Sequence, residues 1–119
     1  MGGAGMRIEL PIRVESEANA REHWAKKAKR VKQHRDAAFW HLKAAQAPRY
    51  IFPLTVRMVR IAPRELDSDN LGSGFKAIRD GVADWLGVKD NDPRVTWDYA
   101  QERGKPNTYA CRIELDGST

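Results

Sequence analysis

Four aspartates in two short segments are the residues best suited to chemistry. Asp67 and Asp69 are two positions apart, and so are Asp90 and Asp92 further along the chain. In an extended segment, side chains two residues apart point to the same side, so Asp67 and Asp69 are predicted to face one site. A third carboxylate, from Asp90 or Asp92, joins them only if the fold brings the two segments together.

Such a carboxylate cluster predicts a bound cation. Two carboxylates about 4 Å apart repel each other by about 4 kcal/mol at an effective dielectric constant of roughly 20, so a fold must protonate one or bind a cation. Oxygen ligands without His or Cys favour Mg²⁺, with Mn²⁺ as the alternative, over zinc. Mg²⁺ held by carboxylates and phosphate oxygens is typical of phosphodiester chemistry, and Lys76 follows closely enough in the sequence to neutralise a scissile phosphate.

Each of these residues also has a purely structural interpretation. Asp67, Asp69 and Asn70 precede a helical pattern and are ordinary helix-capping residues. Lys76 and Asp80 have the four-residue spacing of a surface ion pair on a helix. Only their combination points to a catalytic site.

Positive charge is concentrated between residues 21 and 35. The chain has 21 Lys+Arg, 16 Asp+Glu and a net charge of +5, yet this segment contains a single acid, Glu22. A basic strip beside a nearly neutral remainder is typical of proteins that bind the phosphate backbone, whereas the structural alternative is a solvated helix face. The cations are Arg21 and the six residues predicted to bind DNA: Lys26, Lys27, Lys29, Arg30, Lys32 and Arg35.

Length and composition exclude several classes of protein. A chain of 119 residues fits one domain, here residues 1–119, with 1–6 and 117–119 expected to fray. One cysteine cannot form an internal disulfide, and no apolar run approaches the roughly 18 residues that cross a bilayer. The sequence therefore predicts a cytoplasmic protein with no membrane partner and no small-molecule cofactor.

Hydrophobic periodicity predicts an α+β fold in the order βαβαββ, with a mixed four-stranded sheet packed against two helices. The first helix is expected to begin near a cap at Ser16 or Asn19 and to end near Ala47, and the second to end at Gly87. Most aromatic residues and Cys111 are expected in the core. The predicted strands are Arg7–Val14, Leu54–Ile61, Val95–Tyr99 and Tyr109–Leu115.

Three segments together resemble the RusA-type endodeoxyribonucleases, which are Holliday-junction resolvases of bacteria and their phages. The segments are Leu66–Leu71, Phe75–Val82 and Asp90–Val95. The family pattern is an Asp-x-Asp-Asn-Leu loop, a helix that opens with Lys-Ala and carries an Asp, and an acidic pair before an aliphatic strand. The match covers about 30 of the 119 residues.

The resemblance implies a homodimeric, Mg²⁺-dependent nuclease that cuts symmetrically related strands of a four-way DNA junction during recombination and repair. It implies that Asp67 and Asp69 are paired metal ligands and that Lys76 is the catalytic lysine. The third acid falls on Asp92, with Asp90 as the alternative.

The sequence departs from the family pattern at two places. Residues Gly72–Gly74 look like an insertion before the lysine helix, and the second acidic motif is Asp-Asn-Asp rather than two adjacent acids. The leading hypothesis is a metal-dependent endonuclease that acts on branched DNA. The alternatives are a non-catalytic branched-DNA-binding protein with the same fold and an altered metal site, and a metal-free interaction domain.

Overall fold

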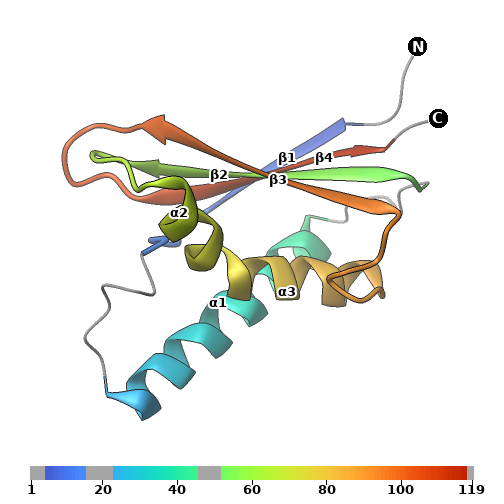
Figure 1. Ribbon diagram of the computed structural model, residues 1–119, viewed down its shortest axis with the longest axis horizontal. Coiled ribbons are helices and arrows are strands. Elements are labelled where there is room, and N and C mark those ends of the chain that lie inside the picture. The colour runs from blue at the N-terminus through green and yellow to red at the C-terminus, as the bar shows by residue number, and fades with distance from the viewer. Residues whose placement is uncertain (1–4, 16–22, 46–51, 118–119) are drawn as a thin grey trace.

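The chain forms a four-stranded sheet with helices on one face (Figure 1). The computed structural model describes residues 5–15, 23–45 and 52–117. The elements are β1 (Gly5–Leu10), α1 (Trp24–Ala44), β2 (Leu54–Ala62), α2 (Ser68–Gly74), α3 (Lys76–Leu86), β3 (Val95–Arg103) and β4 (Ala110–Gly117). The predicted α+β class is confirmed, but two helices, α2 and α3, lie where one was expected.

The sheet is mixed, as predicted, with the strand order β1-β4-β2-β3. Strands β2 and β3 are parallel, with Leu54 opposite Val95 and Ala62 opposite Arg103, whereas β4 is antiparallel to both β1 and β2. A parallel pair needs a crossover connection, and the segment that contains α2 and α3 provides it. The residues of both acidic motifs therefore lie in the connection between β2 and β3.

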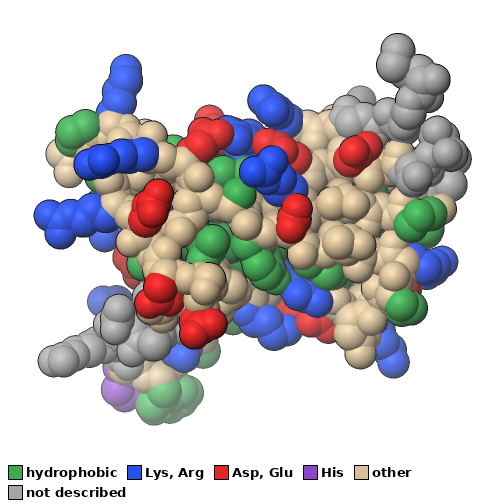
Figure 2. All heavy atoms as spheres, turned by 45° about the horizontal axis from the view of Figure 1, so that its top comes forward, with side chains coloured by type: hydrophobic (Ala, Val, Ile, Leu, Met, Phe, Trp, Pro, Cys, Tyr) green, Lys and Arg blue, Asp and Glu red, His purple; other side chains and the backbone are tan. Residues whose placement is uncertain are grey.

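The core lies between the sheet and the helices. Alternate residues of β2 and β4 are buried against apolar residues of α1 and α3, as period-two strands and amphipathic helices require. The opposite face of the sheet carries interspersed basic and acidic side chains (Figure 2), among them Arg112 paired with Glu102 and Glu114. The main core residues are Leu54, Val56, Met58, Ile113 and Leu115 of the sheet and Ala38, Leu42, Phe75, Ile78 and Val82 of the helices.

The first strand and the chain ends differ from the prediction. Strand β1 ends at Leu10 because Pro11 cannot donate a backbone hydrogen bond, although Val14 beyond it is buried as the alternating pattern indicates. Gly5 pairs with Asp116 in the sheet, and β4 continues to Gly117. The expected fraying is therefore wrong for Gly5, Met6 and Gly117.

Helix α1 begins with His23 as its N-cap, whose Nδ1 accepts from the backbone N–H of Ala25 at 3.3 Å. The predicted caps at Ser16 and Asn19, and the predicted end near Ala47, lie outside the described residues. Trp24 is 76% exposed and Trp40 is 57% exposed, so the expectation that aromatic residues are mostly buried fails on this helix. The N-terminal half of α1 extends away from the sheet (Figure 1). Within the described part of the chain, no helix is both long and apolar enough to span a membrane.

Helices α1 and α3 approach each other closely at Gly81. A Cβ atom at this position would lie 2.2 Å from the carbonyl oxygen of Arg35 and 2.9 Å from the Cβ of Ala38. Any side chain on residue 81 would therefore force the two helices apart. This contact fixes where α1 crosses α3.

We expect Gly81→Ala to lower the free energy of unfolding by about 1–3 kcal/mol, because the added methyl group overpacks the crossing. Urea denaturation would measure the change. The matched control is Gly72→Ala, whose Cβ would meet only Tyr99 Cε2 at 3.9 Å and which should gain up to about 1 kcal/mol from helix propensity. Equal stability of the two variants would contradict the close crossing.

Candidate nucleic-acid-binding cleft

The first acidic motif begins a short helix rather than lying in an extended loop. Asp67 is the N-cap of α2: its Oδ1 accepts from the backbone N–H of Asn70 and its Oδ2 accepts from the side-chain amide of Asn70, both at 2.9 Å. Asp69 lies in the first turn of α2 and is exposed. Residues two apart in a helix do not share a face. The prediction that Asp67 and Asp69 both lie in an extended segment is therefore wrong.

The segment before Asp67 is attached to β3 and β2. The side chain of Gln101 accepts from the N–H of Leu66 at 2.9 Å and donates to its carbonyl oxygen at 2.7 Å. The buried Arg60 donates to the carbonyl oxygen of Arg64 at 2.5 Å, and burial lowers the pKa of this guanidinium. These bonds place Asp67 near the Gln101 end of β3.

Asp92 lies at the other end of β3. Its carbonyl oxygen accepts from the N–H of Val95, the first residue of the strand, at 3.1 Å. Val95 and Gln101 are six residues apart in β3, which corresponds to about 20 Å at roughly 3.3 Å per residue. The predicted group of Asp67, Asp69 and Asp92 is therefore spread along the strand.

Both carboxylate oxygens of Asp92 accept hydrogen bonds from Arg94. Its Oδ1 accepts from the backbone N–H of Arg94 at 2.9 Å and from Nε at 3.0 Å, and its Oδ2 accepts from Nη2 at 2.8 Å. The Arg94 side chain, together with the backbone hydrogen bond, lowers the pKa of Asp92 to about 2. Asp92 thus acts as a turn residue that holds Arg94 at the start of β3.

Asp90 lies beside Lys76, which begins α3. The Nζ of Lys76 donates to Asp80 Oδ1 at 3.0 Å and to Asp90 Oδ2 at 3.1 Å. The hydrogen bonds to Asp80 and then Asp90 raise the pKa of Lys76, and the bond from Lys76 lowers the pKa of Asp90. Of the two candidates for the third acid, Asp90 is the one that the structure brings to the lysine.

Arg79 holds the loop that carries Asp90. Its Nη2 donates to the carbonyl oxygen of Asp90 at 2.7 Å, its Nη1 donates to the Tyr99 hydroxyl at 2.9 Å, and its guanidinium lies 4.7 Å from the centre of the Trp97 ring. The sequence offered no signal for this role. A single arginine on a helix looks like a surface cation, and only the position of the Asp90 loop in the fold shows that Arg79 bonds to it.

A cleft lies between α1, α2 and the start of α3, and we call it the basic cleft. Its volume is about 580 Å³, and its lining includes Lys27 and Val31 of α1, Gly72 and Ser73 of α2, Lys76 of α3, and Asp90. Residues of the basic helix and of the RusA-like motifs, far apart in the sequence, therefore meet at one surface.

Helix α2 forms one wall of this cleft. Gly72 and Ser73 are three and four residues after Asp69, so Asp69 lies on the same side of the helix. A Cβ on Gly74 would lie 2.6 Å from the carbonyl oxygen of Glu15, so α2 packs directly on the segment after β1. The glycine-rich segment suspected as an insertion is the last turn of α2.

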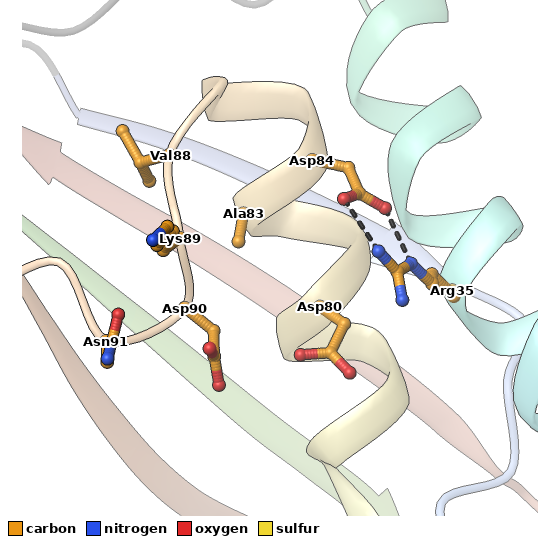
Figure 3. A pocket seen from close by; sticks show the side chains of 8 residues that line it. All are labelled: Arg35, Asp80, Ala83, Asp84, Val88, Lys89, Asp90 and Asn91. Carbon is orange, nitrogen blue, oxygen red and sulfur yellow. Dashed lines mark hydrogen bonds and ion pairs between the residues drawn. The ribbon is translucent and has the colours of Figure 1, made fainter.

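A second, acidic cavity of about 450 Å³ lies between α3 and the loop that follows it. Figure 3 shows Asp80 and Asp90 directed towards the space between helix and loop, while Asp84 forms two hydrogen bonds with Arg35 at 2.7 and 2.9 Å. The hydrogen bonds from Arg35 lower the pKa of Asp84. Arg35 connects α1 to α3 through this ion pair, and its predicted contact with DNA stays a prediction. Asp90 lines both cavities.

The other predicted DNA-binding cations lie on α1 before Arg35. Lys26, Lys27, Lys29 and Lys32 are exposed and Arg30 is partly buried. Lys32 pairs with Asp36 at 2.6 Å, so the charge of this pair is partly balanced within the helix. The prediction that these cations bind DNA stays a prediction, now located on the protruding half of α1.

The predicted Mg²⁺ ligands do not form one metal site as they lie. Within residues 5–15, 23–45 and 52–117, no three His, Cys, Asp or Glu side chains are grouped so that they could hold an ion. Both carboxylate oxygens of Asp67 accept from Asn70, and both of Asp92 accept from Arg94. The donor set Asp67, Asp69 and Asp92 therefore does not fit a single Mg²⁺ in this arrangement.

Comparison with known proteins gives a similarity to a protein whose activity is not stated. No family model matches the chain. The chain is similar to an uncharacterized protein of Xylella fastidiosa, with 36% identity over 81 residues that cover 60% of this chain and 51% of the relative. The chain thus spans about half the length of that protein, whose description states no activity.

The contact between Lys76 and Asp90 can be tested by titration. Lys76 lowers the pKa of Asp90 below the ordinary carboxyl value of 3.8. The Lys76–Asp90 contact therefore stabilises the fold fully above pH 3.8, and this stabilisation is lost as the pH falls through the lowered pKa of Asp90. We expect Lys76→Met to raise the pKa of Asp90 towards 3.8, as measured by NMR of the carboxyl carbon. Lys89→Met, which removes a neighbouring charge but not the 3.1 Å contact, should leave this pKa nearly unchanged. Equal effects of the two variants would contradict the pairing.

Proposed function

We propose that the chain is a RusA-type endonuclease that binds four-way DNA junctions at the basic cleft and cuts one phosphodiester bond in each of two strands. The observation that supports this function most directly is the 3.1 Å contact between Lys76 and Asp90. These residues belong to two separate motifs of the RusA resemblance, and both line the cleft beside the basic helix.

The first step of the proposed function is binding of the DNA backbone by α1. Four exposed lysines on the protruding half of this helix can reach phosphates without a clash with the sheet. Phosphate contacts position DNA without reading its sequence, so selectivity arises from the shape of the junction. The lysines are Lys26, Lys27, Lys29 and Lys32.

At the cleft, Lys76 would hold the scissile phosphate. Its ammonium already bonds to two carboxylates. A phosphate oxygen is also negatively charged, so it would replace one carboxylate as the acceptor of a hydrogen bond from this ammonium. Arg79 would keep the Asp90 loop in place during this exchange. The resemblance also implies Mg²⁺ or Mn²⁺, but Asp67, Asp69 and Asp90 would have to be drawn together before they hold one ion.

The junction and the resemblance together favour a homodimer in the cytoplasm of a bacterium. A four-way junction has approximate two-fold symmetry, and a C2 dimer would present two clefts to symmetrically related strands. Its role would lie in DNA recombination and repair.

The second candidate is a branched-DNA-binding protein without catalytic activity. It is favoured by the spread of the acids along β3 and by the engagement of Asp92 with Arg94. The same basic cleft would bind the junction, but no bond would be cut.

Salt-dependent binding tests the interface on α1. We expect the double variant Lys26→Gln/Lys29→Gln to weaken binding to a synthetic four-way junction and to reduce the slope of log K against log salt by about 2, since each phosphate contact contributes roughly 0.9. Fluorescence anisotropy over a salt series would measure both effects. Arg57→Gln, which removes an exposed cation from the uncovered face of the sheet, is the control and should change little. An unchanged slope in the double variant would remove α1 from the interface.

Cleavage tests the catalytic proposal and separates the two candidates. We expect the wild-type chain to introduce paired nicks in a four-way junction with Mg²⁺ or Mn²⁺, and Asp69→Asn or Asp90→Asn to lower the rate by on the order of a thousandfold while junction binding persists. Asp98→Asn, an exposed carboxylate elsewhere on β3, is the control. Tight binding without any nick in either metal would favour the non-catalytic candidate, and cleavage by both Asp variants at the normal rate would refute these site assignments.

A further inference from the structure

We propose that the basic cleft holds a single unpaired nucleotide of the branched DNA, with the base against apolar side chains and the phosphate between Lys27 and Lys76. This inference rests on the proposed function, because it assumes that branched DNA is the ligand. It adds a feature that neither the motifs nor the resemblance supplies: a site for one base that has left its stack.

The walls of the cleft have the two chemical characters that a nucleotide needs. Val31, Ala77 and Tyr99 provide apolar and aromatic surface, which sequence-tolerant base binding uses because every base has a flat apolar face. Lys27 and Lys76 lie on the same lining and provide cations for a phosphate.

The dimensions of the cleft suit one nucleotide and exclude a duplex. A volume of about 580 Å³ falls within the range of roughly 300–1,000 Å³ that is common for small-ligand sites. A duplex with its bases stacked cannot enter such a space. A base at a branch point or beside a gap leaves the duplex at lower cost than a base inside a stack, so branched DNA supplies the occupant.

Gly72 leaves the cleft open beside Tyr99. A Cβ added at this position would meet Tyr99 Cε2 at 3.9 Å, an ordinary van der Waals contact that requires no backbone shift. A larger side chain would extend from that point into space that the base needs. Gly72 is therefore a position where the cleft can be filled while the fold is preserved.

Charge directs the nucleotide to this cleft rather than to the neighbouring cavity. The basic cleft is lined by the cations Lys27, Lys76 and Arg79 and by one carboxylate, Asp90. The adjoining cavity is lined by three aspartates and by two cations, Arg35 and Lys89, so its net charge is negative and disfavours a phosphate. Asp90 lies at the boundary between the two.

Cleft filling tests the inference. We expect Gly72→Leu to weaken binding of a junction with one unpaired thymidine at the branch by roughly tenfold, because base contacts of this kind typically contribute a factor of that order. Binding of a fully paired linear duplex, which depends on α1, should not change, and the melting temperature should not fall. The matched control is Val88→Leu, which enlarges a side chain of the neighbouring cavity.

Photo-crosslinking locates the base. A junction with 5-iododeoxyuridine as the unpaired nucleotide should crosslink to the wild-type chain at Tyr99 or in the segment 72–77, as mapped by mass spectrometry, and Gly72→Leu should lower the yield. Crosslinks only outside this cleft, or unchanged affinity of Gly72→Leu for the unpaired junction, would overturn the inference while junction binding stands. Failure of the wild-type chain to bind any DNA would overturn the proposed function and the inference with it.

Discussion

The position of α1 relative to α3 depends on one close contact, at Gly81. With no side chain at residue 81, the backbone of α1 at Arg35 rests directly on α3, and the Arg35–Asp84 ion pair closes the same crossing. The part of α1 before this point extends away from the sheet (Figure 1). Lys27 and Val31 of the projecting part become one wall of the basic cleft. The crossing of α1 and α3 thus places the basic strip on the same cleft as Lys76.

The acids of the two motifs avoid mutual repulsion by separation and by pairing. Four aspartates brought within about 4 Å of one another would repel strongly. In the structure, Asp67 caps α2 at one end of β3, while Asp92 pairs with Arg94 at the other end. Arg79 connects the backbone of Asp90 to Tyr99 of β3, and the ammonium of Lys76 bonds to the Asp90 carboxylate. Asp67, Asp90 and Asp92 are therefore each compensated by a donor beside them.

Strands β2 and β4 and the segments that carry the candidate site could be predicted from the sequence, but the bounds of β1 and β3 and the geometry of the site could not. Period-two alternation defined β2 and β4 closely, and Gly87 marked the end of α3 with its positive φ of 75°. The glycines of 72–74 suggested an insertion before the lysine helix, whereas they form the last turn of α2, and Gly74 packs on the segment after β1. The choice between Asp90 and Asp92 depends on how a loop is held against β3 by Arg79, a tertiary contact that no local pattern records.

The two walls of the cleft are anchored by different kinds of contact. Helix α2 is held at its start by the two hydrogen bonds between Leu66 and Gln101, and at its end by the packing of Gly74 on Glu15. The opposite wall is held by side chains: Lys76 and Arg79 bond to Asp90, and Lys76 is largely exposed. A phosphate or a cation that competes for Lys76 or Asp90 acts on these bonds directly, without breaking the core. Under the proposed function, bringing Asp90 towards Asp69 would first require release of the Lys76–Asp90 contact.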